Sequence, residues 1–146
     1  MFVNPQIQST TLTLNTGGTV TAAFYFPRGA RVTRYFAVPA ASQAAHATIV
    51  DTVTFTDEGT DGSGSTVLAV LTNDSDLADS TTRESGAWTA FDAKEINTEN
   101  RPSGTDATNV ADEIAPGGVV SVALLGAGTT PDANFFTVGI EYRVSD

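Results

Sequence analysis

The stretch 135–144 constrains the fold more than any other part of the chain. Apolar side chains occupy every second position from Phe136 to Val144, and Thr, Gly, Glu and Arg fill the positions between them. Side chains alternate across a β-strand, so this pattern predicts a strand with one buried face and one face in water. The sequence ends two residues after this run, and we therefore expect the run to close a single all-β unit.

Similar runs recur along the chain and are separated by turn residues such as Pro27-Arg28-Gly29. No helical stripe interrupts them. The pattern predicts strands at residues 9–15, 19–26, 31–38, 48–56, 66–72, 119–125 and 136–144, and weaker strands at 87–96 and 107–114. The run 66–72 is apolar at nearly every position, as in a strand that is covered on both faces. We therefore predict an all-β, jelly-roll-like sandwich or barrel of about eight or nine antiparallel strands.

The parity of these runs also predicts which side chains form the hydrophobic core. In each run the apolar residues share one face, and that face must be covered to leave water. The predicted core residues are Phe24, Phe36, Val122, Leu124, Val138 and Ile140.

The chain carries a strong acidic excess. It has 146 residues, of which 17 are acidic and seven are basic, and its formal net charge is −10. Such a surface repels phosphate, so we expect no nucleic-acid partner. No apolar window reaches the ~18 residues of a membrane span, so we expect no membrane partner. Acid excess with one lysine also fits a halophilic host, although charge supports solubility in many proteins without high salt.

The sequence offers no catalytic constellation and predicts no cofactor. It contains no cysteine, which excludes a thiol nucleophile, disulfides and Cys-ligated zinc. His46 is the only histidine, and no nucleophile motif accompanies it, so we expect it to be structural. We predict a protein that is not an enzyme.

Two acidic loops could supply oxygen ligands to Ca²⁺. One contains Asp57 and Asp61, and the other contains Asp74 and Asp76. Neither loop has the spacing of an EF-hand, which needs a glycine at its sixth position and a glutamate at its twelfth. The sequence therefore favours solvated acidic loops without a metal ion.

Positive charge is concentrated at one turn. Arg28, Arg31 and Arg34 are three of the seven basic residues. By strand parity, Arg31 and Arg34 should point to opposite faces, and Arg34 should lie at the sheet end or pair with a carboxylate. The cluster predicts either docking onto an acidic partner or a neighbouring subunit, or ion pairs within the chain.

We divide the chain into an N-terminal arm at residues 1–8 and one all-β domain at residues 9–146. The arm is uncharged and includes Phe2, Val3 and Ile7. Such an arm can add a strand to another chain, or it can be the first stretch of the sandwich itself.

Four stretches of the chain resemble small structural proteins of tailed viruses, including bacteriophages. They are residues 19–40, with P-x-G-A-x-V between two strands, and residues 61–74, 116–122 and 138–144. In the order of these pieces the chain is similar to capsid decoration (cement) proteins. The resemblance implies a jelly roll on the outer capsid surface of the virion, made in the host cytoplasm. It also implies a homotrimer that binds the major capsid protein, and no site residue carries over because the family has no catalytic motif. The homotrimer interface would then use the arginine turn and the arm.

Two other functions fit an all-β fold. The first is a receptor- or glycan-binding head or tail-fibre module, in which Trp88, Tyr25 and Tyr35 would form a sugar-stacking platform. These aromatic residues are scattered through the predicted strands, so the sequence favours packing in the core or at a subunit interface. The second is a cupin-like enzyme, whose metal site would need several histidines.

Overall fold

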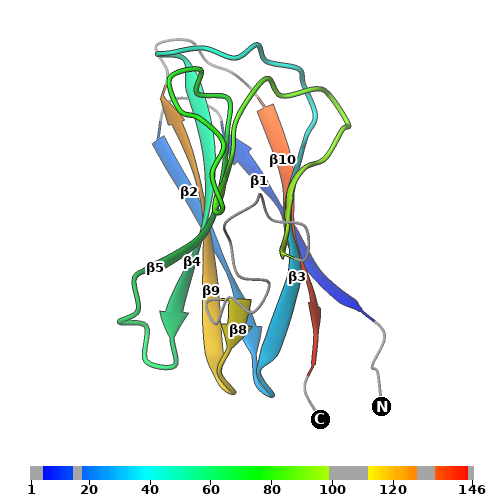
Figure 1. Ribbon diagram of the computed structural model, residues 1–146, viewed down its shortest axis with the longest axis vertical. Helices are drawn as coiled ribbons and strands as arrows, with labels where there is room; N and C mark the ends of the chain where they lie inside the picture. The colour runs from blue at the N-terminus through cyan, green and yellow to red at the C-terminus, as the bar shows by residue number, and fades with distance from the viewer. Residues whose placement is uncertain (1–4, 15–17, 99–111, 128–133, 145–146) are drawn as a thin grey trace.

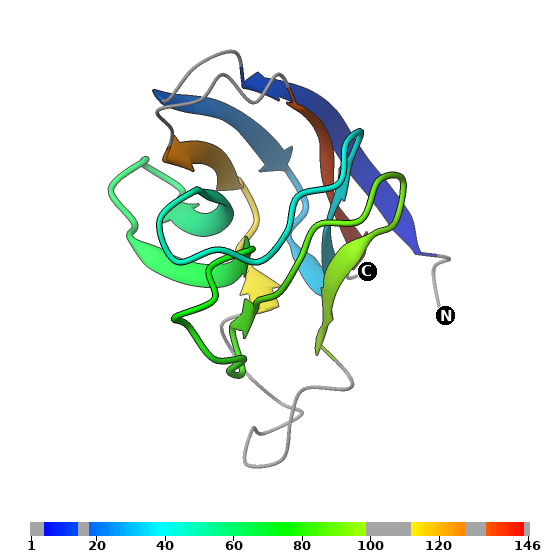
Figure 2. The same ribbon diagram turned by 90° about the horizontal axis from the view of Figure 1, so that it is seen from above.

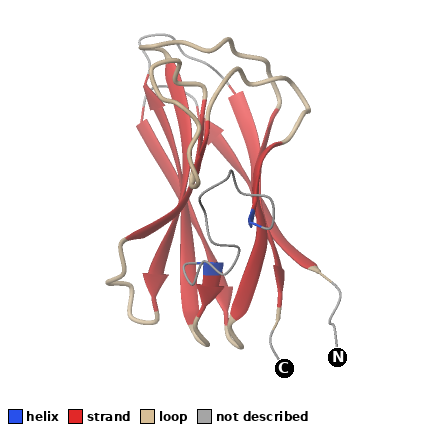
Figure 3. Cartoon of the chain, in the orientation of Figure 1, coloured by secondary structure: helices blue, strands red, loops and turns tan. Residues whose placement is uncertain are grey.

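The computed structural model describes residues 5–14, 18–98, 112–127 and 134–144, and in these the protein is all-β (Figure 3). Apart from short 3₁₀ turns at Thr98 and Asp112, the described residues hold no helix, and none of them forms a helical membrane span. The strands are β1 (Gln6–Leu14), β2 (Gly18–Phe26), β3 (Ala30–Pro39), β4 (Val50–Gly59), β5 (Thr66–Thr72), β6 (Arg83–Glu84), β7 (Lys94–Asn97), β8 (Glu113–Ile114), β9 (Gly118–Ala127) and β10 (Asn134–Arg143).

The strands form two sheets that face each other as a sandwich (Figures 1 and 2). Sheet A has the order β1-β10-β3-β7, with β8 also beside β3, and sheet B has the order β2-β9-β4-β5-β6. Neighbouring strands are antiparallel except for β5 and β6, which are parallel. The predicted jelly-roll-like sandwich is confirmed, and the described strands number ten because β6 and β8 contain two residues each.

The core lies between the two sheets, and five of the six predicted core residues are in it. Phe24, Val122, Leu124, Val138 and Ile140 are at most 4% exposed. Each comes from the inward parity of its strand, so alternation placed them correctly.

A β-bulge in β3 makes the predicted parity of that strand wrong. In β10, residues 141 and 142 pair with Arg34 and Val32, which leaves Thr33 as an extra residue in β3. Its Oγ1 donates to the carboxylate of Glu141 at 3.0 Å and to the backbone oxygen of that residue at 3.2 Å. Beyond this bulge, the side chains that were predicted to face inward lie on the outer face.

Phe36 is therefore a correction to the predicted core. It is 8% exposed, but it lies on the outer face of sheet A, where its ring covers Gly139. The guanidinium of Arg34 lies 4.9 Å from the ring centroid. Tyr35 and Ala37 occupy the inward positions instead, and both are fully buried.

The other strand boundaries follow the predictions in part. β1 begins at Gln6, three residues before the predicted start, and β4 begins at Val50. The predicted strand 87–96 is a strand only from Lys94, as β7. The predicted strand 107–114 is seen at β8, and its residues 107–111 lie outside the described residues.

Segment 73–98 lies along the side of the sandwich opposite β1 and β2 and is tied to the 40–49 connector (Figure 2). The side-chain nitrogen Nδ2 of Asn73 donates to two backbone carbonyl oxygens of that connector, at 2.9 and 3.1 Å. The backbone of Trp88 exchanges two hydrogen bonds of 2.8 Å with Gln43. The segment is therefore held by the buried Asn73 and the buried Trp88 rather than by long strands.

Candidate functional site

Three arginines, Arg28, Arg31 and Arg143, lie on or next to strands β2, β3 and β10, and Glu113 of β8 is also a register partner of Arg31. The β2–β3 hairpin that carries Arg28 lies at one end of the sandwich (Figure 1). Arg28 is exposed at the hairpin tip, where Gly29 adopts a φ of 73° and its N–H donates to Phe26 O at 3.2 Å. Arg31 in β3 pairs in register with Arg143 in β10, so the two side chains leave the same face. The sequence indicated Arg28 and Arg31, but Arg143 joins them only through the register of distant strands.

Arg34 does not point away from Arg31, as was predicted, because the bulge at Thr33 puts both on the outer face of sheet A. Its guanidinium makes salt bridges to Glu95 at 2.8 Å and to Glu141 at 3.4 Å. The predicted carboxylate pairing of Arg34 is confirmed. These two carboxylates compensate the charge of Arg34, so it adds little to the positive charge of the other three arginines.

Part of the predicted N-terminal arm belongs to the sandwich. β1 pairs with β10 along its whole length, and Ile7 within it is 55% exposed. Gln8 Nε2 donates to the carbonyl oxygen of Tyr25 at 3.0 Å and so links the two edge strands. Phe2 and Val3 lie outside the described residues.

A pocket of about 220 Å³ lies between β1 and β2 beside the hairpin. Phe26 and Tyr142 form its aromatic wall, with their rings in an edge-to-face contact at 4.9 Å. The hydroxyl of Tyr142 donates to Gln6 Oε1 at 3.2 Å. Sites for drug-sized ligands usually exceed about 300 Å³, so this pocket fits a side chain better than a metabolite.

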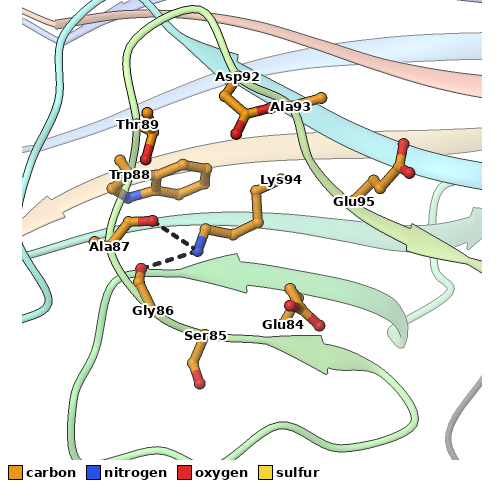
Figure 4. A pocket seen from close by; sticks show the side chains of 10 residues that line it. All are labelled: Glu84, Ser85, Gly86, Ala87, Trp88, Thr89, Asp92, Ala93, Lys94 and Glu95. Carbon is orange, nitrogen blue, oxygen red and sulfur yellow. Dashed lines mark hydrogen bonds between the residues drawn. The ribbon is translucent and has the colours of Figure 1, made fainter.

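A second pocket, of about 370 Å³, surrounds the chain's only lysine (Figure 4). Lys94 Nζ donates to the carbonyl oxygens of Gly86 at 2.9 Å and Ala87 at 3.3 Å. The same nitrogen lies 4.8 Å from the centroid of the Trp88 ring. Partial burial lowers the pKa of Lys94, and the charges of nearby Glu84 and Asp79 oppose this effect. Through these contacts Lys94 stabilises the loop that connects Gly86 to β7.

The pKa values of the two carboxylates near Lys94, those of Glu84 and Asp79, are shifted in opposite directions. Burial and the charge of Asp79 raise the pKa of Glu84, although Lys94 opposes the shift. Hydrogen bonds from the backbone and hydroxyl of Ser85, at 2.7 and 2.8 Å, lower the pKa of Asp79. If Glu84 were a catalytic general acid, it would have to act beside a matched nucleophile or a second carboxylate at a bound substrate. Lys94 Nζ is already hydrogen-bonded to two carbonyl oxygens, so it is not available as that nucleophile.

His46 caps a turn in the connector. Its Nδ1 accepts hydrogen bonds from the backbone nitrogens of Thr48 at 3.0 Å and Ile49 at 2.9 Å. Because Nδ1 accepts these hydrogen bonds, the neutral ring carries its proton on Nε2, the nitrogen that would otherwise take the proton of a nucleophile. This arrangement supports the predicted structural role.

Three of the four candidate calcium ligands accept hydrogen bonds within turns. Asp57 accepts the N–H of Gly59 at 2.9 Å, and Asp74 accepts the N–H of Asp76 at 2.8 Å. Asp61 accepts hydrogen bonds from the backbone and hydroxyl of Ser63, which lower its pKa. Within the part of the chain that the structure describes, no three acidic, His or Cys side chains gather in a way that could hold a metal ion.

The alternative of a sugar-stacking platform is not realised, because its three aromatic rings do not share one open surface. Trp88 is 1% exposed and packs edge-on against Phe136, with ring centroids 5.0 Å apart. Tyr35 is fully buried, and Tyr25 is 57% exposed on the other sheet. A stacked sugar needs open ring faces on one surface, and these three rings do not supply one.

No family model matches the chain, and no curated protein matches it. Among solved structures, it is weakly similar to the structure of the infectious bursal disease virus Gx strain, with 14% identity and a TM-score of 0.27. It is likewise similar to the VP2 subviral particle of infectious bursal disease virus, with 11% identity and a TM-score of 0.27.

These alignments cover 98% and 99% of this chain but only 41% and 42% of the viral chains, so this chain spans less than half of their length. TM-scores this low do not establish a common fold. The likeness therefore carries no argument about what this chain does.

Proposed function

We propose that the chain is a non-enzymatic structural protein of a virus particle, namely a capsid decoration protein that stabilises the outer shell. The observation that carries this proposal is the charge distribution of the sandwich. An acidic chain has Arg28 at the β2–β3 turn and Arg31 beside Arg143, with Glu113 as the other register partner of Arg31. We call these three arginines the arginine end, and oppositely charged patches guide and orient protein association.

In this proposal the arginine end attaches to acidic groups of the major capsid protein. Guanidinium groups suit this role because they bind carboxylates in a bidentate geometry. Residues 1–8 of the chain supply apolar contacts to the shell through Phe2, Val3 and Ile7. The copies on the shell are oligomers, and the protein is located at the virion surface.

The aromatic side chains favour this function over a glycan-binding fibre module. Trp88 and Tyr35 are buried in the core, so they are not available to stack on a sugar. A receptor-binding module would have to use a surface of another chemistry.

Imaging and binding experiments test the proposal together. Electron cryomicroscopy of assembled particles should place the copies on the outer shell, and copies at a fibre tip would contradict it. In a binding assay with shells that lack the protein, the double variant Arg28→Gln and Arg31→Gln should bind at least ~10-fold more weakly. Because the contact is charged and exposed, the parent's affinity should fall as salt rises.

The matched control is the double variant Ser75→Glu and Thr89→Glu. It makes the same change in net charge, but in exposed loops at the opposite end of the sandwich (Figure 1). This control should bind like the parent. Equal loss of binding in both double variants would show that net charge, and not the arginine end, governs attachment.

A further inference from the structure

The outward positions of β2, β9, β4 and β5 in sheet B form a surface of uncharged side chains, and Arg83 of β6, the register partner of Val70, lies at its edge. Four strands supply it, and their side chains line up in cross-strand rows. The rows are Thr19, Leu125 and Thr52; Thr21, Ala123, Thr54 and Val70; Ala23, Ser121, Thr56 and Val67; and Tyr25 and Val119. We call these residues the sheet B face. Glu58 borders the face at the end of β4, and its carboxylate accepts a hydrogen bond from Ser121 Oγ at 2.5 Å.

The charged residues of sheet B are confined to β4 and β6. β2, β5 and β9 contain no charged residue, although the chain as a whole has 17 acidic and seven basic residues. The outer face of sheet A carries Arg34, Glu95 and Glu141, joined by salt bridges. The sheet B face is therefore an exception on a surface that is otherwise rich in charge.

Two strands of sheet B have the sequence of strands that are covered on both sides. β5 and β9 are apolar at inward and outward positions alike, a pattern typical of strands buried between two layers. Yet Val67 in β5 is 45% exposed and Leu125 in β9 is 51% exposed. Tyr25 in the neighbouring strand β2 is 57% exposed. A surface with this pattern lacks a covering layer in the isolated chain.

A second copy of the chain fits the sheet B face better than its other surfaces do. Each copy carries a net charge of −10, and like charges brought together oppose association. Two copies can therefore approach most closely where carboxylates are fewest, and on the sheet B face the bordering carboxylate of Glu58 is hydrogen-bonded to Ser121. The small Thr, Ala, Ser and Val side chains of the face also allow sheets to pack at the ~10 Å spacing of a sandwich.

We propose that the sheet B face is the surface on which a second copy of this chain docks. This inference goes beyond the proposed attachment to a shell, since it concerns the purified protein with no shell present. It also assigns the two contacts to different surfaces, because copies meet through the sheet B face and the shell is bound at the arginine end.

The test is the self-association of purified full-length protein, measured by sedimentation velocity over about 1–200 µM. The parent should form an oligomer, and that association should persist or strengthen as salt rises because the face is uncharged. Thr21→Glu and Ala123→Glu place a carboxylate in the same central row, and each should weaken association at least ~10-fold. Thr21 is exposed, so its variant carries the test if Ala123→Glu does not fold.

The matched control is Thr137→Glu, which makes the same substitution at an exposed position of β10 on the outer face of sheet A. This variant should associate like the parent, and thermal melting should show that the variants compared are folded. A parent that remains monomeric at the highest concentration overturns the proposal. So does a folded Thr21→Glu variant that associates as tightly as the parent. Neither result would change the shell-binding assay, so the two proposals fail separately.

Discussion

Gly139→Ala tests the close approach of β1, β10 and Phe36 on the outer face of sheet A. A Cβ at position 139 would overlap the Phe36 ring and would lie 2.7 Å from the carbonyl oxygen of Gln8. Neither neighbour can move away freely, because Gln8 in β1 is paired with β10 and the Phe36 ring is covered by the guanidinium of Arg34. Overpacking of this kind costs about 1–3 kcal/mol. Urea unfolding should show a lower midpoint with an unchanged slope.

The Phe36→Leu background separates the two clashes. Removing the aromatic ring relieves one of them, so Gly139→Ala should cost less there than in the parent, by a coupling energy of about 0.5–3 kcal/mol. Thr137→Ala, an exposed change in the same strand, should stay within about 0.5 kcal/mol of the parent. The reasoning is refuted if Gly139→Ala costs less than about 0.5 kcal/mol, or if its cost is the same with and without the Phe36 ring.

Two further predictions concern the core and the Lys94 pocket. Ile140→Ala should lower the free energy of unfolding by about 2–4 kcal/mol, because Ile140 is fully buried; a loss below about 0.5 kcal/mol would contradict its place in the core. Glu84 has a raised folded pKa, so its ionisation costs stability above that pKa, and the cost disappears as pH falls below the unfolded value. Glu84→Gln should therefore be more stable than the parent at pH 7, by less than about 1 kcal/mol, and should match it near pH 3 in the same unfolding assay.

Strand existence could be predicted from local alternation, but the parity of β3 could not. Val32, Phe36 and Val38 share one parity in the sequence, which is why they were predicted to face inward together. The extra residue at Thr33 is accommodated by its hydrogen bonds to Glu141, a residue more than one hundred positions away. Nothing in the neighbouring sequence indicates such a bulge, so every side chain after it in β3 was assigned to the wrong face.

The candidate surfaces depend on the same kind of long-range information. Arg28 and Arg31 are close in sequence, and their cluster was visible there. Arg143 reaches them through strand register, and the pocket around Lys94 forms because Trp88 is anchored to Gln43. The apolar run 66–72 predicted a strand covered on both faces, and this prediction is wrong at Val67, which is 45% exposed.

The two proposed surfaces respond to salt in opposite ways, and this contrast makes their combination testable. Contacts through Arg28 and Arg31 are screened within about 8–10 Å at physiological ionic strength. Contacts through the sheet B face bury Tyr25, Leu125 and Val67 and pair no charges, while salt reduces the repulsion between two acidic copies. Raising salt should therefore release the protein from a shell before it separates the copies from one another. A protein that dissociates into monomers at the salt concentration that detaches it would show that one charged surface serves both contacts.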